Sequence, residues 1–80
     1  MVQRIVRITK VIAEQGICRS TIYNRISRGL FPRPISLGPR MVGWREVEIE
    51  AINAAHIRGA SEDEIRALVV ELEADRKNAA

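Results

Sequence analysis

The sequence GICRSTIYNRISRGLFPRPI, residues 16–35, contains the most informative structural signals of the chain. Its first part predicts a helix that begins after Cys18, at the cap position, and ends at Gly29, which can adopt the left-handed conformation of a helix C-terminus. Apolar and aromatic side chains share one side of this helix, and polar or basic side chains cover the other. The first group consists of Ile22, Tyr23 and Ile26. One face is therefore expected to pack and the other to stay free.

A shorter helix is predicted immediately before this stretch. Thr9 is a suitable N-cap, residues 10–15 include three consecutive apolar positions, and Gly16 stands where such a helix ends. The two helices and the tight turn between them form a helix-turn-helix. Upstream, the short apolar run of Ile5, Val6 and Ile8 is compatible with a strand.

A β-hairpin is predicted after residue 30. The run Phe31-Pro-Arg-Pro34 cannot continue a helix, because proline lacks a backbone N–H. Apolar and polar residues then alternate up to a turn at Gly38-Pro39-Arg40 and alternate again on the return. The apolar side chains expected to point inwards are Ile35, Leu37, Val42 and Trp44. Arg40 would lie at the tip, and Trp44 would be a structural residue that closes the hairpin.

A third helix is predicted from the residue after Trp44 to about Arg58, with Gly59 ending it. A buried stripe is expected at Ile49, Ile52 and Ala55. Three acidic residues, Glu46, Glu48 and Glu50, stand near the positive end of the helix dipole. We expect these carboxylates on exposed turns.

A fourth helix follows the capping-box sequence Ser61-Glu-Asp-Glu64. Its apolar stripe is formed by Ile65, Leu68, Val69 and Leu72. We expect the stripe either to fold back on the first and third helices or to pair with a second chain, and the tail from Asp75 to fray. The fold class is thus mainly α with a small β-hairpin: a winged helix-turn-helix over residues 1–59, then a C-terminal helix and tail over residues 60–80.

The charge is distributed unevenly along the chain. Residues 1–45 contain nine basic residues and one acidic residue, a net charge of +8, whereas residues 46–80 contain four basic and nine acidic residues, a net charge of −5. Eight of the nine basic residues in the first half are arginines, which suit phosphates and guanine edges. A basic front on an acidic back favours a polyanionic ligand such as nucleic acid.

Several other classes of function are not expected. One cysteine and one histidine provide neither an internal disulfide nor a zinc ligand set, and no catalytic constellation or Gly-rich phosphate loop is present. We therefore expect no enzyme activity, no metal and no cofactor. The sequence shows neither a membrane-spanning stretch nor a signal peptide, so we expect a cytoplasmic protein that does not bind membranes.

The residues suited to DNA binding fall into groups by chemistry. Ser20 and Thr21 have short hydroxyls that fit phosphates at a helix N-terminus. Asn24, Arg25 and Arg28 fit base edges in the major groove, because Asn pairs with adenine and Arg with guanine. Arg40 suits a narrow minor groove. The other candidates are Lys10 and Arg33 for phosphates, the Tyr23 hydroxyl, although Tyr23 is mainly expected to pack in the core, and Arg19.

Two further motifs, in register with residues 16–24 and 29–35, complete the pattern: Leu37-Gly-Pro-Arg40 and Val42-Gly-Trp44. Over residues 5–58 the sequence resembles the AlpA family of prophage regulatory proteins, which is similar to the excisionases and to the MerR-type DNA-binding domain. The resemblance implies an activator of a phage integrase gene or a recombination directionality factor that bends attachment-site DNA. The fourth helix lies outside the resemblance.

The sequence departs from the family at three positions. Cys18 replaces a usual serine cap, Ile52 a common tryptophan, and Asn24 a frequent basic residue. The implied partners are double-stranded DNA and a tyrosine-type integrase, with a homodimer or cooperative assembly on DNA. The alternative function is a protein-interaction module that modulates a recombinase or another regulator. Neither the target sequence nor the choice between transcription and excision follows from the residues.

Overall fold

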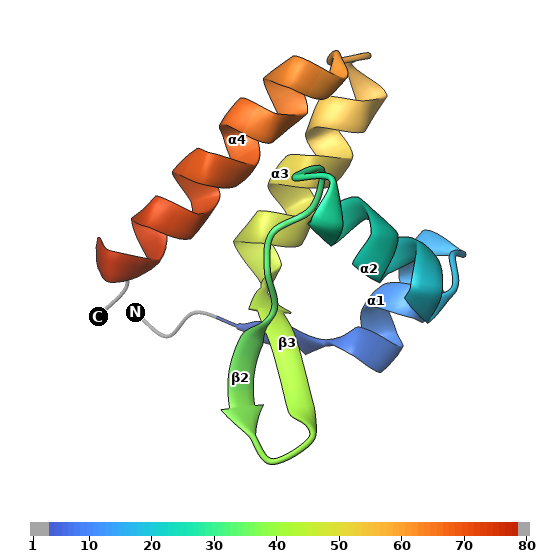
Figure 1. Cartoon of the computed structure of the whole chain (residues 1–80), viewed down its shortest axis with the longest axis vertical. Helices are drawn as coiled ribbons and strands as arrows, with labels where there is room; N and C mark the ends of the chain where they lie inside the picture. The colour runs from blue at the N-terminus through green and yellow to red at the C-terminus, as the bar shows by residue number, and fades with distance from the viewer. Residues whose placement is uncertain (1–3, 79–80) are drawn as a thin grey trace.

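The computed structural model describes residues 4–78 of the chain. Its elements in chain order are β1 (Ile5–Arg7), α1 (Ile8–Gln15), α2 (Arg19–Ser27), β2 (Ile35–Gly38), β3 (Met41–Arg45), α3 (Glu46–Ile57), α4 (Glu62–Asp75) and the 3₁₀ turn η1 (Arg76–Asn78). The hairpin of β2 and β3 projects away from the helices (Figure 1). The fold is the predicted mainly helical winged helix-turn-helix with an additional C-terminal helix.

The three strands form an antiparallel sheet in the order β1, β3, β2. The predicted upstream strand pairs with β3 and places Val6 opposite Trp44. The register between β2 and β3 shifts between Ser36 and Gly38, next to the hairpin turn. Because β3 is central and runs directly into α3, the hairpin is fixed to the helical core through its longer strand.

Trp44 lies in the core, as predicted for a structural residue. Its side chain is fully buried, and its ring meets Phe31 edge to face with 5.3 Å between the ring centroids. Its indole Nε1–H donates a hydrogen bond of 2.7 Å to the carbonyl oxygen of Pro32. The rest of the core consists of Val6, Ile8, Val11, Ile22, Leu30, Ile49, Ile52, Ala55, Ile65 and Val69. A single core therefore joins the sheet to all four helices.

The expected start of the first helix is wrong by two residues. α1 begins at Ile8 with Arg7 as an extended N-cap, and Thr9 lies inside the helix. The cause is the preceding strand, because pairing of Arg7 with Gly43 holds Arg7 in the extended conformation that a cap requires. At its other end the helix stops at Gly16, as predicted, and this glycine caps it in the left-handed conformation with a φ of 66°.

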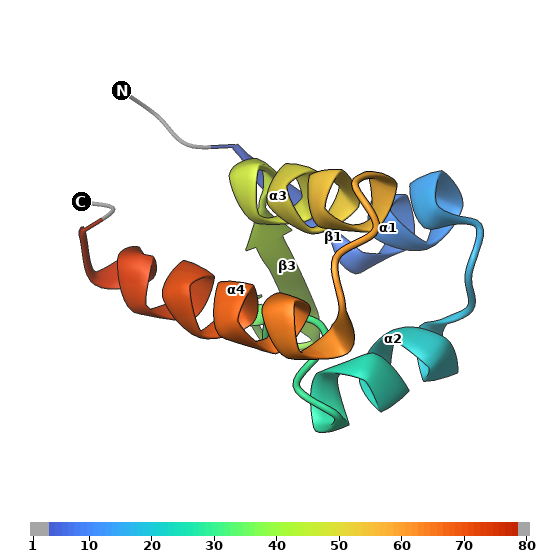
Figure 2. The same cartoon turned by 90° about the horizontal axis from the view of Figure 1, so that it is seen from above.

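α4 packs along α3, and its apolar stripe is buried within the same chain (Figure 2). Ile65 and Val69 are 4% and 5% exposed, and Leu68 and Leu72 pack against the core at its edge. The expected packing on the third helix is confirmed, but the expected packing on the first helix is wrong, since α1 lies on the opposite side of the molecule in both views. The segment before β2 supplies the surface instead, because Leu30 and Phe31 share the same core.

A buried ionic network at the start of α3 overturns two expectations. Glu48 was expected on an exposed helix turn, but its side chain is fully buried between Arg45 and Arg76. Arg76 Nε donates to Glu48 Oε2 at 2.7 Å and Arg45 Nε to the same oxygen at 3.0 Å. The tail therefore does not fray at Asp75, since η1 is anchored through Arg76. Residues 79–80, the end of the expected frayed tail, lie outside the described residues.

Candidate nucleic-acid interface

α2 presents an outward face that carries no acidic side chain. Ile22 is buried beneath this helix, as predicted, whereas Tyr23 is 42% exposed instead of packing mainly in the core. The reason is the helical rotation of about 100° per residue, which turns position 23 well away from position 22. The exposed side chains of the helix and its C-cap are Arg19, Ser20, Tyr23, Asn24, Ser27 and Arg28. Ser27 was not among the predicted residues.

The N-terminus of α2 has an unusual cap. Cys18 is the N-cap residue, as predicted, but its side chain accepts no hydrogen bond from the helix backbone. Its Sγ atom instead contacts Ser20 Oγ at 3.1 Å and Thr21 Oγ1 at 3.2 Å. The hydrogen bonds from Ser20 and then Thr21 lower the pKa of the exposed Cys18 thiol from 9.0 to about 7. The two hydroxyls predicted to bind phosphate therefore share one small cluster with a sulfur atom.

Arg40 occupies the hairpin turn in a backbone conformation that favours glycine. Its φ is 60°, and it is the single non-glycine residue with positive φ among residues 4–78. An L-residue with a β-carbon is disfavoured there by about 1–2 kcal/mol. A side chain retained at a strained position is an indication of function. Arg40 is exposed, as predicted for the tip of the hairpin.

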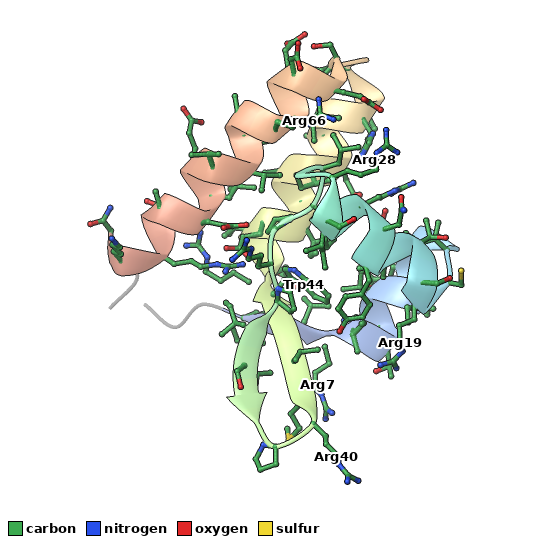
Figure 3. The ribbon with its side chains drawn as sticks, viewed as in Figure 1. Arg7, Arg19, Arg28, Arg40, Trp44 and Arg66 are labelled. Carbon is green, nitrogen blue, oxygen red and sulfur yellow. The ribbon has the colours of Figure 1, made fainter. Side chains whose placement is uncertain are left out.

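Three arginines lie on one side of the molecule, over the space between the hairpin and the start of α2. Figure 3 shows Arg7, Arg19 and Arg40 on this side, from β1, α2 and the hairpin turn. Each is exposed, and none has an acidic partner within 4 Å among residues 4–78. Arg7 was not predicted as a site residue. The feature that could have identified Arg7 is the alternation in β1, where the side chain of Val6 is buried and those of its two neighbours are exposed.

Two other predicted cations, Lys10 and Arg28, already have acidic partners within the chain. Lys10 faces Glu14 at 3.8 Å on α1, and the Arg28 guanidinium lies 3.1 Å from Glu62. Arg28 stands at the opposite end of α2 from Arg19 (Figure 3). Arg33 is exposed before β2, and its backbone N–H and carbonyl bond to side chains of the C-terminal part of the chain. Arg28 therefore lies apart from the three unpaired arginines (Figure 3).

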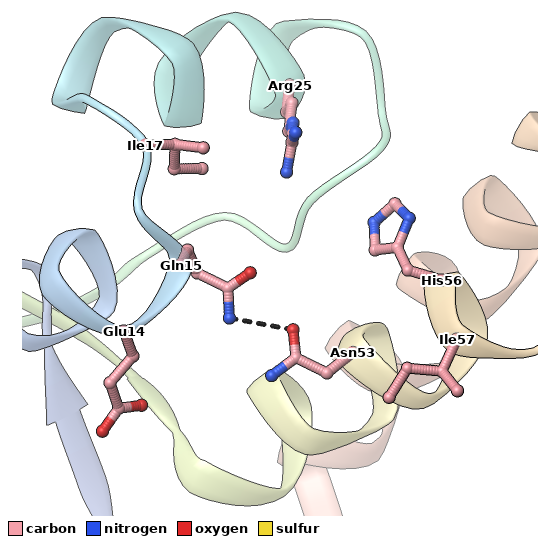
Figure 4. A pocket seen from close by; sticks show the side chains of 7 residues that line it. All are labelled: Glu14, Gln15, Ile17, Arg25, Asn53, His56 and Ile57. Atoms are coloured by element: carbon pink, nitrogen blue, oxygen red, sulfur yellow. Dashed lines mark hydrogen bonds between the residues drawn. The ribbon is translucent and has the colours of Figure 1, made fainter.

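Arg25 points away from the outward face of α2. Figure 4 shows it directed into a cavity of about 420 Å³ that is also lined by residues of α1 and α3. Across this cavity Gln15 Nε2 donates a hydrogen bond of 2.8 Å to Asn53 Oδ1, and His56 stands nearby. Contact between Arg25 and bases stays a prediction, and it requires the side chain to leave this cavity.

Two further observations concern the described part of the chain. Among residues 4–78, no three His, Cys, Asp or Glu side chains are grouped so that they could hold a metal ion. In the same residues, every helix is too short or too polar to cross a bilayer.

Comparison with known proteins identifies the family. The family model described as prophage CP4-57 regulatory protein (AlpA) matches residues 4–52, which comprise β1 to the middle of α3. The chain is also 40% identical over 57 residues to a protein of Enterobacteria phage P4 named "Uncharacterized protein ORF88". The aligned region covers 71% of this chain and 65% of that protein, slightly under two thirds of its length. No solved structure matches the chain. The chain therefore belongs to the AlpA family of prophage regulatory proteins.

Proposed function

We propose that this chain binds double-stranded DNA, with α2 in the major groove and the hairpin against the neighbouring minor groove. The observation that carries the proposal is the position of Arg7, Arg19 and Arg40 on one side, without acidic partners among residues 4–78. Unpaired arginines that converge from three elements attract a polyanion, and duplex DNA is the polyanion whose grooves match a helix beside a hairpin.

The exposed side chains of α2 divide between positioning and reading. Ser20 and Thr21, at the helix N-terminus, contact phosphate, which fixes the orientation of the helix without reading sequence. Asn24 is exposed in the middle of the helix and pairs with adenine. Arg28 reads guanine after exchanging its contact with Glu62 for a base. Lys10 and Arg33 contribute contacts with phosphate at the edges.

Within the family, we propose a role in prophage gene control or excision. The chain activates transcription of an integrase gene, or it bends attachment-site DNA as a recombination directionality factor with a tyrosine-type integrase as partner. Both roles place it in the cytoplasm, where the DNA lies, and both use cooperative assembly of several copies or a homodimer. Bending assays on the attachment site and a reporter for the integrase promoter distinguish the two roles.

The experiment that tests DNA binding is selection from a library of random duplexes, followed by titration of the selected duplex at several salt concentrations. A protein that contacts about four to six phosphates gives a slope of log K against log salt of roughly −4 to −5. Binding that does not respond to salt, or no binding at low salt, contradicts the proposal. A chain that captures the integrase but no duplex is instead the interaction module considered above.

A further inference from the structure

Segment 28–33, which leads from the end of α2 towards β2, is held at both ends by side chains of the C-terminal region. At the α2 end, Arg66 Nε donates a hydrogen bond of 3.0 Å to the carbonyl oxygen of Arg28. At the hairpin end, the Arg33 N–H donates to Glu73 Oε2 at 3.0 Å, and Arg76 Nη2 donates to the Arg33 carbonyl oxygen at 2.7 Å. The segment that joins the two proposed DNA-binding elements therefore has its backbone bound by α4 and η1.

Packing reinforces the contact at the α2 end. Gly29 has a φ of 74°, and a β-carbon built on it would lie 3.6 Å from Cγ of Arg66. The aliphatic part of the Arg66 side chain thus covers the turn that ends α2. Next to it, Leu30 and Phe31 are buried in the core that also contains Ile65 and Val69. The turn has little freedom to move without disturbing α4.

The hairpin end is attached even more firmly. Arg76 binds the fully buried Glu48 through two hydrogen bonds of 2.7 and 2.9 Å. The same glutamate binds Arg45, the last residue of β3, and Arg45 Nη2 donates to the carbonyl oxygen of Leu72 in α4 at 3.0 Å. Hydrogen bonding to Glu48 raises the pKa of Arg76, so its charge is retained. The C-terminal end of α4 is therefore bound to both strands at the base of the hairpin, through Arg33 before β2 and through Arg45 at the end of β3.

We propose that α4 is a positioning element for DNA recognition, in which Arg66 at one end and Glu73 with Arg76 at the other fix the location of α2 relative to the hairpin. This inference rests on the proposed DNA binding. A helix is stiff, and the seven positions from Arg66 to Glu73 in α4 span about 10.5 Å at 1.5 Å per residue, which sets the distance between the contacts at the two ends of the segment. α4 lies outside residues 4–52, so this positioning element is an addition to the part of the chain that matches the family model.

α4 acts on DNA only through the elements it holds. Its remaining surface carries exposed acids, including Glu64 and Glu71, which phosphates would repel. Arg66 is engaged by Asp63 and Glu62 as well as by the Arg28 carbonyl. Arg66, Glu73 and Arg76 are thus positioning residues.

The test uses the full chain with Arg66→Met and Glu73→Ala combined. Arg66→Met keeps much of the aliphatic cover over Gly29 but removes the donor to Arg28, and Glu73→Ala removes the acceptor from Arg33. The net charge is unchanged, so affinity for a scrambled duplex should stay the same. The control combines Lys77→Met with Glu71→Ala, which also preserves the charge and alters exposed residues for which no contact with segment 28–33 is found.

The first measurement is the ratio of affinities for the selected and the scrambled duplex. We expect the positioning variant to lose about tenfold in this ratio, equal to about 1.4 kcal/mol, and the control to keep it. The variant should also tolerate duplexes in which one base pair is inserted between the parts protected by α2 and by the hairpin. A folded positioning variant with the ratio and spacing dependence of the wild type overturns the inference. If the wild type itself binds no duplex, the proposed function fails.

The second measurement needs no DNA. Cys18 is the sole cysteine and stands at the start of α2, so Met41→Cys at the hairpin completes a pair of sites for spin labels. We expect a broader distribution of label distances in the positioning variant than in the control. An equally narrow distribution overturns the inference even if DNA binding fails. Melting curves establish that each variant is folded, and the single variants Arg66→Met and Glu73→Ala replace the double variant if it is unfolded at the assay temperature.

Discussion

The indole N–H of Trp44 and the carbonyl oxygen of Pro32, 2.7 Å apart, join the central strand of the hairpin to the segment that follows α2. Trp44→Ala should lower the free energy of unfolding by about 3–5 kcal/mol, because it removes a fully buried ring. Trp44→Phe keeps an aromatic ring but leaves the buried Pro32 carbonyl without its donor, which costs about 1–3 kcal/mol. Urea denaturation measures both losses. Tyr23→Phe, at an exposed position, is the control and should change stability little.

Substitutions of Arg40 test whether this residue contributes to DNA binding or to the stability of the fold. Arg40→Gly relieves about 1–2 kcal/mol of strain from the positive φ but increases the entropy of the unfolded chain by an opposing amount of about 0.4–1 kcal/mol, so the melting temperature should stay the same or rise slightly. Affinity for the selected duplex should nevertheless fall by about 1–3 kcal/mol, as expected for loss of a groove contact. Arg40→Ala should show the same loss of binding. If either variant loses stability in proportion to binding, Arg40 is a structural residue.

The face of α2 offers a test of sequence reading. Asn24→Ala should cost about 1–3 kcal/mol on the selected duplex and relax the preference at one base pair. Lys10→Ala should weaken selected and scrambled duplexes alike, because a phosphate contact carries no sequence information. Parallel titrations of both variants on both duplexes provide the comparison. Equal losses on the two duplexes for Asn24→Ala would show that this position does not read bases.

The lowered pKa of Cys18 predicts a pH-dependent reactivity. Alkylation of the folded protein should rise with pH and reach half its maximum near pH 7, where a thiol with its ordinary pKa of 9.0 would still be protonated. Since the pKa is lower in the folded state, this group favours folding at high pH, and its contribution is lost as the pH falls from 9 through 7. Ser20→Ala should shift the alkylation profile towards higher pH. An unchanged profile would show that the Ser20 hydroxyl does not stabilise the thiolate.

Truncation after Gly59 tests the role of α4 in stability and the division of the chain at that residue. Burial of Ile65 and Val69 alone contributes about 1.5–3 kcal/mol each, a large part of the 5–15 kcal/mol that stabilises a typical domain. We expect a much lower melting temperature, and we expect both the full and the truncated chain to sediment as monomers. Loss of a dimer on truncation would instead show that the stripe pairs with a second chain.

Most of the fold follows from local signals in the sequence. The glycines at positions 16 and 29, the prolines before β2 and the capping box at Ser61 each act within a few residues, and the structure confirms the ends they mark. The start of α1 was misplaced because strand pairing to a distant residue, Gly43, decides it. Long-range pairing leaves no mark in the local pattern.

The site was predictable where a residue type and a helical position suffice. Ser20 and Asn24 are exposed on α2 as expected, but Arg25 turns into a cavity, because a helix of nine residues has basic side chains on more than one side. Arg7 was missed because its neighbours at the surface come from α2 and the hairpin. Glu48 was misjudged because its two arginine partners are separated from it by 3 and 28 positions. A carboxylate at a helix start otherwise indicates a simple dipole contact.

The network at Glu48 also leads to an expectation about the order of folding. During synthesis the N-terminal part of the chain is released first, yet Arg76 follows Glu48 by 28 positions. Before Arg76 is available, the carboxylate has only Arg45 beside it, and burial of an incompletely paired charge is unfavourable by several kcal/mol. We therefore expect the start of α3 to close on the sheet only when η1 has formed. Chains that end before Arg76 should therefore lack the closed contact between the start of α3 and the sheet.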